Sequence, residues 1–535
     1  MTKITCTLGP SSSTLGILQD VADAGMSIGR VNFSHVKPNE YEFPLSLAKN
    51  VRNLDGMHTR VLGRDYNMTA MLLDTKGPEI RTGVIAGQVA GTANKYIDFV
   101  EDEEVLVTTN PVYKDKCDDK ILYVDYNAIG NTVNVGSTLL IDDGLIGFEV
   151  KSIIRSADEV LEDGSPGWSE LLCRVDNGGS LGSSKGVNIP NTVLQLPAMT
   201  PKDKDDMLWA IRNNVVDIVA ASFVRKGGDV RSIKAHLERC IMKVKSEGGT
   251  YDDNLRPWIV SKIENKEGVD NFEEILKESD GIMIARGDLG VEIPFAELLI
   301  LQKRMIRLCN LAGKPVIVAT QMLDSMQRNP RPTRAEVTDV GNAVLDGADC
   351  VMLSGESANG KYPVESVETM STIVMHADEA LDKKKGFSNI GARRVEMAAL
   401  IAHNASSLDA ICSSAIKIAE QTDADLIIAI SRLGATVQKL AKYRPGVPIM
   451  AFVPNCAIGR RLVLHRGVYP IVMEKANFGG SGGTEHDRVV EAMRTAKEIG
   501  WIKTNNRVVV VDAELWDLEA GSKMTKANCI KIFTV

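Results

Sequence analysis

An alternation of short apolar runs with helical patterns constrains the fold more than any other feature of this sequence. Eight runs rich in apolar or β-branched residues are expected to be strands, and they lie at residues 4–8, 28–33, 71–74, 216–220, 258–263, 281–285, 316–319 and 350–353. Strands that alternate with helices favour a parallel sheet, and eight such units predict a (β/α)8 TIM barrel. An open, doubly wound sheet is the alternative that this pattern leaves open.

The alternation stops after the third strand and resumes near Met207. The interruption, residues 79–196, holds many short strand-like runs separated by Gly, Asp and Asn, which predicts an inserted small β-barrel. The loops that follow the strands form the active-site face of a (β/α)8 barrel. An insert at that position is therefore expected to act as a lid.

A polar, basic stretch at residues 382–394, DKKKGFSNIGARR, predicts a linker after the barrel. Alternation then returns, with strands expected at residues 426–430, 449–453, 468–473, 508–512 and 529–534. The sequence thus predicts three domains. They are a catalytic barrel (1–78 and 197–381), an inserted β-barrel lid domain (79–196) and a C-terminal α/β domain (382–535).

Composition argues against several classes of protein. A formal net charge of −8 disfavours general binding to nucleic acid or to acidic membranes. The nine cysteines form no CxxC pair, which fits reduced thiols better than a disulfide framework. The first residues lack the layout of a signal peptide, and no stretch approaches the roughly 18 apolar residues of a membrane span. We therefore expect a cytoplasmic protein.

The residues at the ends of the fifth and sixth strands indicate a metal-assisted reaction. Lys262 and Glu264 are two residues apart, so they project from the same side of a strand. Asp288 follows the next strand, and two carboxylates with substrate oxygens are the usual ligands of Mg²⁺ in phosphoryl-transfer sites. Lys262 can stabilise charge that develops on an oxygen. A structural Lys–Glu ion pair is the alternative.

A second group of polar residues follows the second and third strands. Arg30 has the shape to bind a phosphate. The other members supply oxygen atoms that suit a monovalent cation, and they are Asn32, Ser34, Asp74 and Thr75. Such residues are also ordinary turn caps, which is the competing interpretation. Thr320 adds a hydroxyl after the seventh strand, and the whole set describes a Mg²⁺-assisted phosphoryl site.

Several long stretches make the chain resemble the pyruvate kinases. They include TKITCTLGPSS, RVNFSH, LLDTKGPEIRTG, KGVNIP, SKIENKEGV, IARGDLGVEIP and TRAEVTDVGNAVLDGAD. The resemblance is close over residues 2 to 380 and holds in outline beyond them. It implies transfer of the phosphoryl group of phosphoenolpyruvate to ADP, with Mg²⁺ (or Mn²⁺) and K⁺ as cofactors, in a homotetramer.

The resemblance also implies a role for each matching position. Lys262 and Thr320 would be catalytic, with Arg30 on the phosphate. Gly287, Asp288, Thr320 and Lys262 would bind phosphoenolpyruvate, and Glu264 with Asp288 would bind Mg²⁺. The K⁺ ligands would be Asn32, Ser34, Asp74 and Thr75. The nucleotide would contact Asn32, His35, Arg81 and Lys185, with Asp142 and Asp143 approaching as the lid closes. Glu79 would mark the K⁺-dependent type, unless it merely pairs with Arg81 or Lys76.

The C-terminal domain departs from the family pattern. Ser431 and Thr436 match a loop that grips a sugar-phosphate effector in many relatives, but Leu433 stands where a hydroxyl is usual. Residues 513–521 carry three carboxylates where a Gly-rich effector loop is expected, and these would repel a phosphorylated ligand. An effector site and a plain subunit-contact domain both stay open.

Two rival functions lack support. A carbon–carbon lyase on a related barrel would have neither the inserted β-domain nor a lysine placed like Lys262. A non-catalytic scaffold would have lost a ligand, whereas Lys262, Glu264, Asp288 and Thr320 are all present.

Overall fold

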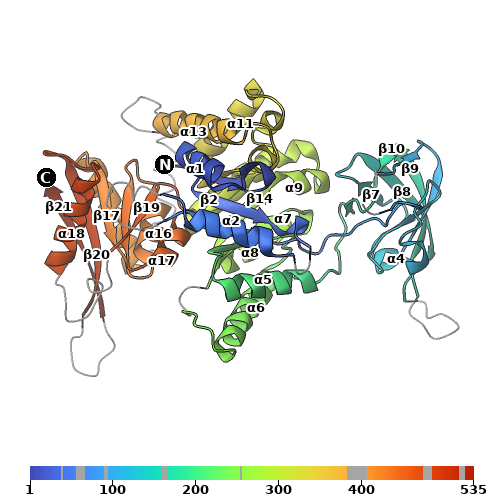
Figure 1. Cartoon of the computed structure of the whole chain (residues 1–535), viewed down its shortest axis with the longest axis horizontal. Helices are drawn as coiled ribbons and strands as arrows, with labels where there is room; N and C mark the ends of the chain where they lie inside the picture. The colour runs from blue at the N-terminus through green and yellow to red at the C-terminus, as the bar shows by residue number, and fades with distance from the viewer. Residues whose placement is uncertain are drawn as a thin grey trace.

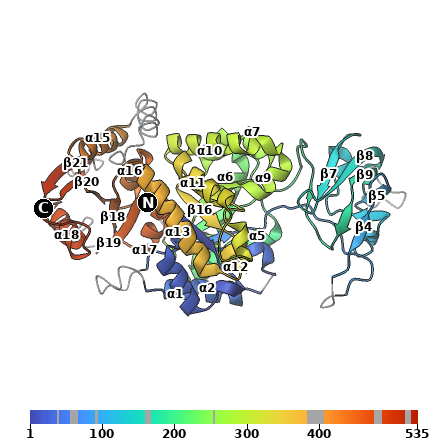
Figure 2. The same ribbon diagram turned by 90° about the horizontal axis from the view of Figure 1, so that it is seen from above.

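The computed structural model describes residues 1–37, 40–55, 67–89, 94–158, 167–252, 256–381, 406–473, 485–516 and 525–535. The chain forms three parts in a row, and the barrel lies in the middle (Figure 1). The inserted segment and the C-terminal segment extend from opposite ends of it, as the view from above also shows (Figure 2). The predicted linker at residues 382–394 lies outside the described residues.

Eight parallel strands close into the predicted barrel. They are β1 (Lys3–Thr7), β2 (Ile28–Asn32), β3 (Ala70–Asp74), β12 (Ile218–Ala221), β13 (Trp258–Ile263), β14 (Gly281–Ala285), β15 (Val316–Ala319) and β16 (Cys350–Leu353). The barrel closes because β1 pairs with β16, from Lys3 opposite Cys350 to Cys6 opposite Leu353. That pairing rules out the open, doubly wound sheet.

Amphipathic helices cover the outside of the barrel. The main ones are α1 (Leu15–Ala24), α2 (Glu42–Arg52), α5 (Pro201–Asn213), α6 (Gly227–Ser246), α8 (Phe272–Glu278), α10 (Leu298–Ala312), α11 (Arg334–Asp346) and α13 (Pro363–Ala380). Alternate strand residues serve two cores: Leu73 and Val219 pack under the helices, whereas Leu72 and Ile218 fill the barrel interior. The interior is therefore packed largely with apolar side chains.

The inserted segment is built from short strands around its own apolar core. A six-stranded sheet has the order β11 (Val187–Asn188), β7 (Thr138–Ile141), β8 (Ile146–Arg155), β9 (Glu170–Asn177), β5 (Glu104–Thr108) and β6 (Ile121–Tyr123). The pair β10 (Gly179–Leu181) and β4 (Ile97–Phe99) joins the same core, where Phe99 meets Phe148 edge-on at 5.1 Å. The segment leaves the barrel after β3 and returns before β12, so it lies at the end where the strands terminate (Figure 1).

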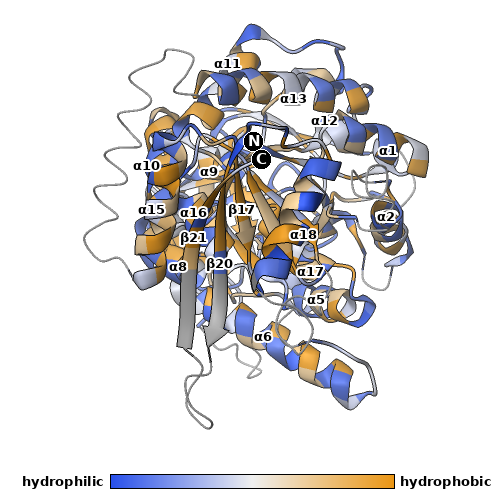
Figure 3. Ribbon diagram, turned by 90° about the vertical axis from the view of Figure 1, so that its left-hand side faces the viewer, coloured by the Kyte–Doolittle hydropathy of each residue, from blue (hydrophilic) through white to orange (hydrophobic). Residues whose placement is uncertain are grey.

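The C-terminal segment is a five-stranded sheet with helices on both faces. The strand order is β19 (Val468–Val472), β18 (Ile449–Val453), β17 (Leu426–Ile430), β20 (Arg507–Trp516) and β21 (Thr525–Thr534), and only β21 is antiparallel. One face packs against α15 (Ser407–Gln421), α16 (Ala435–Lys442) and α17 (Cys456–Leu462), and the other against α18 (Glu485–Glu498). Its apolar strands lie between amphipathic helices (Figure 3). The strands β20 and β21 are longer than predicted, because their backbone pairing continues from Asp512 to Trp516.

Partly buried ion pairs join the C-terminal segment to the end of the barrel where the strands begin. Arg444 donates to both carboxylate oxygens of Asp349, at 2.7 and 2.6 Å, and Arg466 donates to Asp378 at 2.7 Å. Trp258, at the start of β13, stacks edge-on with His465 at 5.7 Å. This segment is therefore attached at the end of the barrel opposite the inserted segment. None of the helices described here is long and apolar enough to cross a membrane.

Candidate active site

The register of the barrel brings the predicted polar residues to one rim. Asn32 lies directly opposite Asp74 on the neighbouring strand, and Lys262 lies opposite Met283, two residues before the end of β14. Because all eight strands are parallel, their carboxyl ends open onto the same face of the barrel. The side chains that follow β2, β3, β13, β14 and β15 thus surround one space.

Lys262 is the centre of this rim. Its Nζ lies 3.0 Å from Asp74 Oδ1, 2.8 Å from Glu264 Oε1 and 2.8 Å from Ser222 Oγ. Only 9% of Lys262 is exposed. Burial alone would lower the pKa of this ammonium, but the Asp74 and Glu264 carboxylates outweigh burial and raise the pKa. Lys262 is therefore a fixed positive charge and cannot act as a base near neutral pH.

Arg30 shares Asp74 with Lys262. Its Nε donates to Asp74 Oδ2 at 2.7 Å, and its Nη1 donates to Thr7 Oγ1 at 2.7 Å. Burial opposes ionisation of Asp74, but the two cations lower its pKa below the ordinary value. Asp74 thus holds two cations side by side at the rim.

Glu264 and Asp288 form a carboxylate pair whose chemistry suits a divalent cation. Glu264 is fully buried, its Oε2 accepts from the Phe223 amide at 2.6 Å, and its carboxyl group is within hydrogen-bond reach of Asp288. Burial and the neighbouring Asp288 raise the pKa of Glu264 to about 7 against the opposing effect of Lys262, and burial also raises the pKa of Asp288. A fully buried and a half-buried carboxyl that resist ionising together are stabilised by a hard cation, so the pair fits Mg²⁺.

The protein supplies only part of such a coordination sphere. Across the described part of the chain, no group of three or more His, Cys, Asp and Glu side chains is placed to hold a metal ion. Mg²⁺ commonly binds through one or two carboxylates and completes its six ligands with water and substrate oxygens. A two-carboxylate site therefore agrees with a metal that binds together with a phosphorylated substrate.

Gly287 and Thr320 pack against each other beside this pair. A side chain at Gly287 would put its Cβ 2.9 Å from Thr320 Cγ2, so glycine here lets the Thr320 side chain lie close against the backbone. Thr320 has a φ of 77°, which is strained for a β-branched residue. Arg286 holds this conformation by donating to the Ala319 carbonyl at 3.2 Å and the Thr320 carbonyl at 2.7 Å.

The expected monovalent-cation residues lie together, although some of them also cap turns. Asn32 Oδ1 accepts from the Ser34 amide at 3.1 Å, and Thr75 Oγ1 accepts from the Ser222 amide at 3.0 Å. Asn32 and Asp74 are adjacent through the strand register. Both interpretations of this set, cation ligands and turn caps, agree with these contacts.

The expected nucleotide residues come from both sides of the rim. His35 is exposed next to β2, whereas Arg81 and Lys185 belong to the inserted segment. Arg81 Nε donates to Glu79 at 2.7 Å, so the pairing considered for Glu79 is present. Lys185 Nζ contacts Asp142 Oδ1 at 2.8 Å, and 38% of the Lys185 side chain is exposed.

The expected effector residues have local structural roles. Ser431 Oγ accepts from the Gly434 amide at 3.1 Å, and Thr436 is buried in the first turn of α16. Leu433 between them is 58% exposed. The side chains of residues 513–521 lie outside the described ones.

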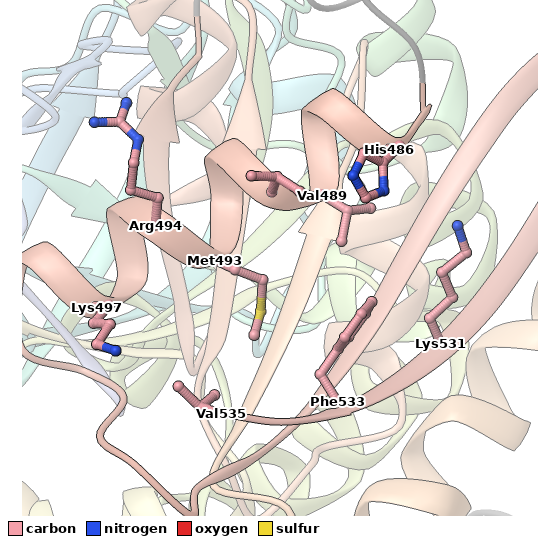
Figure 4. Close-up of a pocket in the computed structure, with 9 residues that line it drawn as sticks. His486, Val489, Met493, Arg494, Lys497, Lys531, Phe533 and Val535 are labelled. Carbon is pink, nitrogen blue, oxygen red and sulfur yellow. The ribbon is translucent and has the colours of Figure 1, made fainter.

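A cavity of about 510 Å³ opens in the C-terminal segment, between α18 and β21, on the face of the five-stranded sheet that α18 covers (Figure 4). Its lining residues are His486, Val489, Val490, Met493, Arg494, Lys497, Lys531, Phe533 and Val535. It borders the outermost strand of the sheet and is separate from the barrel rim.

Two residues of the rim were not expected from the sequence. Ser222, which bonds to Lys262, follows β12 and could have been found by examining the end of the fourth barrel strand as the others were. Arg286 precedes Gly287 in the sequence, but only the structure shows that it fixes the backbone of Thr320 and pairs with Asp339 at 2.8 Å.

Comparisons with known proteins agree along the whole chain. The family model for the pyruvate kinase barrel domain matches residues 1–367, and that for the pyruvate kinase alpha/beta domain matches residues 409–533. A pyruvate kinase from Hypocrea jecorina is 40% identical over 95% of this chain and 87% of its own length. One from Kluyveromyces lactis is 38% identical over 100% of this chain and 96% of its own length.

A solved structure gives the same result. The crystal structure of a pyruvate kinase from Cryptosporidium parvum superposes with a TM-score of 0.83 at 34% identity, covering 100% of this chain and 96% of that one. The chain therefore belongs to the pyruvate kinase family of glycolytic phosphotransferases, which transfer the phosphoryl group of phosphoenolpyruvate to ADP.

Proposed function

We propose that the rim around Lys262 is the site at which this chain transfers the phosphoryl group. The observation that carries the proposal is the position of Lys262 Nζ, a buried ammonium held by Asp74, Glu264 and Ser222. A preorganised cation of this kind stabilises the negative charge that develops on the enolate oxygen as the phosphorus–oxygen bond breaks. Its cost of reorganisation is small because its partners already fix it.

The remaining rim residues have roles that follow from their chemistry. Arg30 would bind the phosphate, since its Nη2 is not used by Asp74 or Thr7. Gly287 and Thr320 would contact the substrate carboxylate, with the Thr320 hydroxyl near the carbon that takes up a proton. Glu264 and Asp288 would hold Mg²⁺ (or Mn²⁺). When bound, this ion would neutralise charge on the transferring group.

A monovalent cation and the nucleotide would complete the site. Asn32, Ser34, Asp74 and Thr75 would supply oxygen ligands for K⁺. Arg81 and Lys185 from the inserted segment would meet ADP on the side facing Asn32 and His35, with Asp142 and Asp143 moving in as the lid closes. Closure would exclude water from a reaction in which hydrolysis competes with transfer.

A direct assay separates this function from its rivals. Phosphoenolpyruvate, ADP, Mg²⁺ and K⁺ together should yield pyruvate and ATP, and omission of ADP should abolish pyruvate formation. A lyase would form pyruvate from an acid sugar without ADP, and a scaffold would form none. Pyruvate formation that does not depend on ADP would contradict the assignment.

We further propose a cytoplasmic homotetramer with contacts through the barrel and the C-terminal segment. Two features support these contacts. Leu299 and Ile300 in the first turn of α10 and Phe295 just before it expose apolar side chains, with Phe295 87% exposed. At the other end, β21 is paired on one side only among the strands that the structure describes, and an open strand edge favours pairing with another chain.

The domain limits and the effector site stay proposals. We place the barrel at residues 1–78 and 197–381, the lid at 79–196 and the C-terminal domain at 382–535. A sugar-phosphate effector would bind at the loop from Ser431 to Thr436. A thermal-shift screen with sugar phosphates tests this, because a ligand that binds the folded state raises the melting temperature.

A further inference from the structure

One four-residue segment, Ser222 to Arg225, contacts the catalytic rim and both chain crossings into the lid. It follows β12, whose end carries no residue assigned to the reaction. Ser222 Oγ lies 2.8 Å from Lys262 Nζ, and the Phe223 amide donates to Glu264 Oε2 at 2.6 Å. The segment thus bonds directly to the lysine and to one of the two proposed metal ligands.

The outgoing crossing, from β3 to the lid, packs against the same two residues. A side chain at Gly77 would put its Cβ 2.7 Å from Ser222 Cβ and 2.9 Å from Phe223 Cδ2. Gly77 also has a φ of 73°, which glycine adopts without strain. The Ser222 hydroxyl lies 2.7 Å from the Thr75 carbonyl on the same crossing. The outgoing chain therefore cannot shift at Gly77 without disturbing Ser222 and Phe223.

The return crossing is held by Arg225. Its guanidinium is almost fully buried and donates to the carbonyls of Leu194 at 3.0 Å, Leu196 and Pro197 at 3.2 Å. Leu194 and Leu196 pack their side chains against the core of the lid. The residues that Arg225 holds therefore form one of the two crossings by which the lid is attached to the barrel.

The backbone of Arg225 is held in turn by two side chains of the barrel domain. Its amide donates to Asp229 Oδ2 at 3.1 Å, and its carbonyl accepts from Asn271 Nδ2 at 2.9 Å. The carboxylate of Asp229 stays 3.8 Å from the Arg225 Nε. The guanidinium therefore acts through directional bonds to three carbonyls, which a lysine ammonium cannot reproduce with the same geometry.

We propose that Ser222 to Arg225 couples the state of the catalytic rim to the position of the lid, and that Arg225 is the positioning residue of this coupling. Phe223 has a φ of 54°, an uncommon conformation for a bulky residue, so the segment is held between its two sets of partners. A shift of Glu264 or Lys262 when substrate binds moves Phe223 and Ser222, and Arg225 transmits the shift to residues 194–197. This inference rests on the proposed roles of Lys262 and Glu264.

Arg225→Gln and Arg225→Lys test the inference in the full-length enzyme. Both should raise the KM for ADP about tenfold, the equivalent of one lost hydrogen bond to a charged group, and both should lower kcat. The affinity for phosphoenolpyruvate with Mg²⁺, measured by thermal shift, should stay within about twofold, because those ligands lie on the barrel. Small-angle scattering should show compaction on adding Mg²⁺, phosphoenolpyruvate and ADP in the parent, and little compaction in either variant.

Arg231→Gln is the matched control, since Arg231 lies on the adjoining helix, is exposed and pairs with Glu278 at the surface. It should leave both KM values and the compaction unchanged. A KM for ADP within twofold of the parent in both Arg225 variants overturns the inference, as does an equal loss of affinity for both substrates. If Arg225→Gln fails to fold, the test rests on Arg225→Lys, because this variant keeps the buried positive charge. If instead the proposed catalytic site is wrong, the Lys262→Met variant will keep a rate within fivefold of the parent.

Discussion

Replacing Lys262 by methionine separates its electrostatic role from its structural one. Methionine keeps most of the length of the lysine side chain but removes the charge that lies 3.0 Å from Asp74 and 2.8 Å from Glu264. One preorganised donor to a developing oxyanion contributes about 10²- to 10³-fold in rate. We therefore expect kcat to fall by about 10² to 10³ at saturating substrates.

The structure also sets the expected loss of stability. Removing one partner of a buried ion pair costs about 3–5 kcal/mol when the other charge is left uncompensated. Here Asp74 keeps Arg30 at 2.7 Å, and the pKa of Glu264, already raised to about 7, should rise further once Lys262, which opposes that rise, is removed, so Glu264 can take up a proton near neutral pH. The variant should therefore lose less than that full amount and remain folded.

The assay measures three quantities on the parent and the variant. They are kcat from pyruvate release, the melting temperature, and the shift of that temperature by phosphoenolpyruvate with Mg²⁺. Lys266→Met is the control, because Lys266 lies four residues further on, is partly exposed and pairs with Asp270 on the surface. The control should keep the parent values for all three.

A Lys262→Met enzyme within fivefold of the parent rate would refute the reasoning. So would a variant that loses the rate only because it no longer folds, since the remaining partners of Asp74 and Glu264 were expected to preserve the fold. A variant that folds and binds phosphoenolpyruvate but turns over at least a hundredfold more slowly would support the electrostatic role.

Three further predictions concern cations and assembly. Glu264→Gln and Asp288→Asn should each weaken the apparent Mg²⁺ affinity. In the parent the Mg²⁺ affinity should rise as pH increases from 6 to 8, because Mg²⁺ must displace the proton held by Glu264, whose pKa is about 7. If the Mg²⁺ titration of one variant equals that of the parent, the residue changed in that variant is structural and does not bind the metal. K⁺ should activate the parent strongly in a tetramethylammonium background, and the Glu79→Lys variant should depend on K⁺ less. If the parent turns over equally fast with and without K⁺, the expected K⁺ ligands are only turn caps. Light scattering should give a tetramer of the 58.1 kDa chain, which Phe295→Glu should weaken; a monomeric parent at micromolar concentration would contradict this.

The barrel could be predicted from the sequence because its strands are buried on both faces. Such strands appear as short continuous apolar runs, like IVAA at β12 and VIVA at β15, with helical patterns between them. The extended hairpin β20–β21 was only partly predicted, since its apolar run ends near Asp512 while the backbone pairing continues to Trp516. Pairing between neighbouring strands needs no apolar side chains, so hydropathy does not mark where it ends.

The residues of the rim could be predicted where they lie at the end of a strand and carry a charge. Lys262 and Glu264 satisfy both conditions, and their spacing of two places them on one side of β13. Ser222 and Arg225 could not be predicted by these two conditions. Ser222 is an ordinary hydroxyl after a strand, and the partners of Arg225 are backbone carbonyls about 30 residues earlier, which no side-chain pattern encodes.

The charges at the rim account for the proposed requirement for added cations. Arg30 and Lys262 supply two positive charges against the carboxyl groups of Asp74, Glu264 and Asp288. The pKa of Glu264, raised to about 7, shows that the buried rim already resists its third negative charge. Phosphoenolpyruvate adds a phosphate and a carboxylate, and Arg81 offers limited compensation because it pairs with Glu79. A divalent ion between Glu264 and Asp288 and a monovalent ion beside Asp74 would restore the balance, so the cations should bind tightly only together with the substrate.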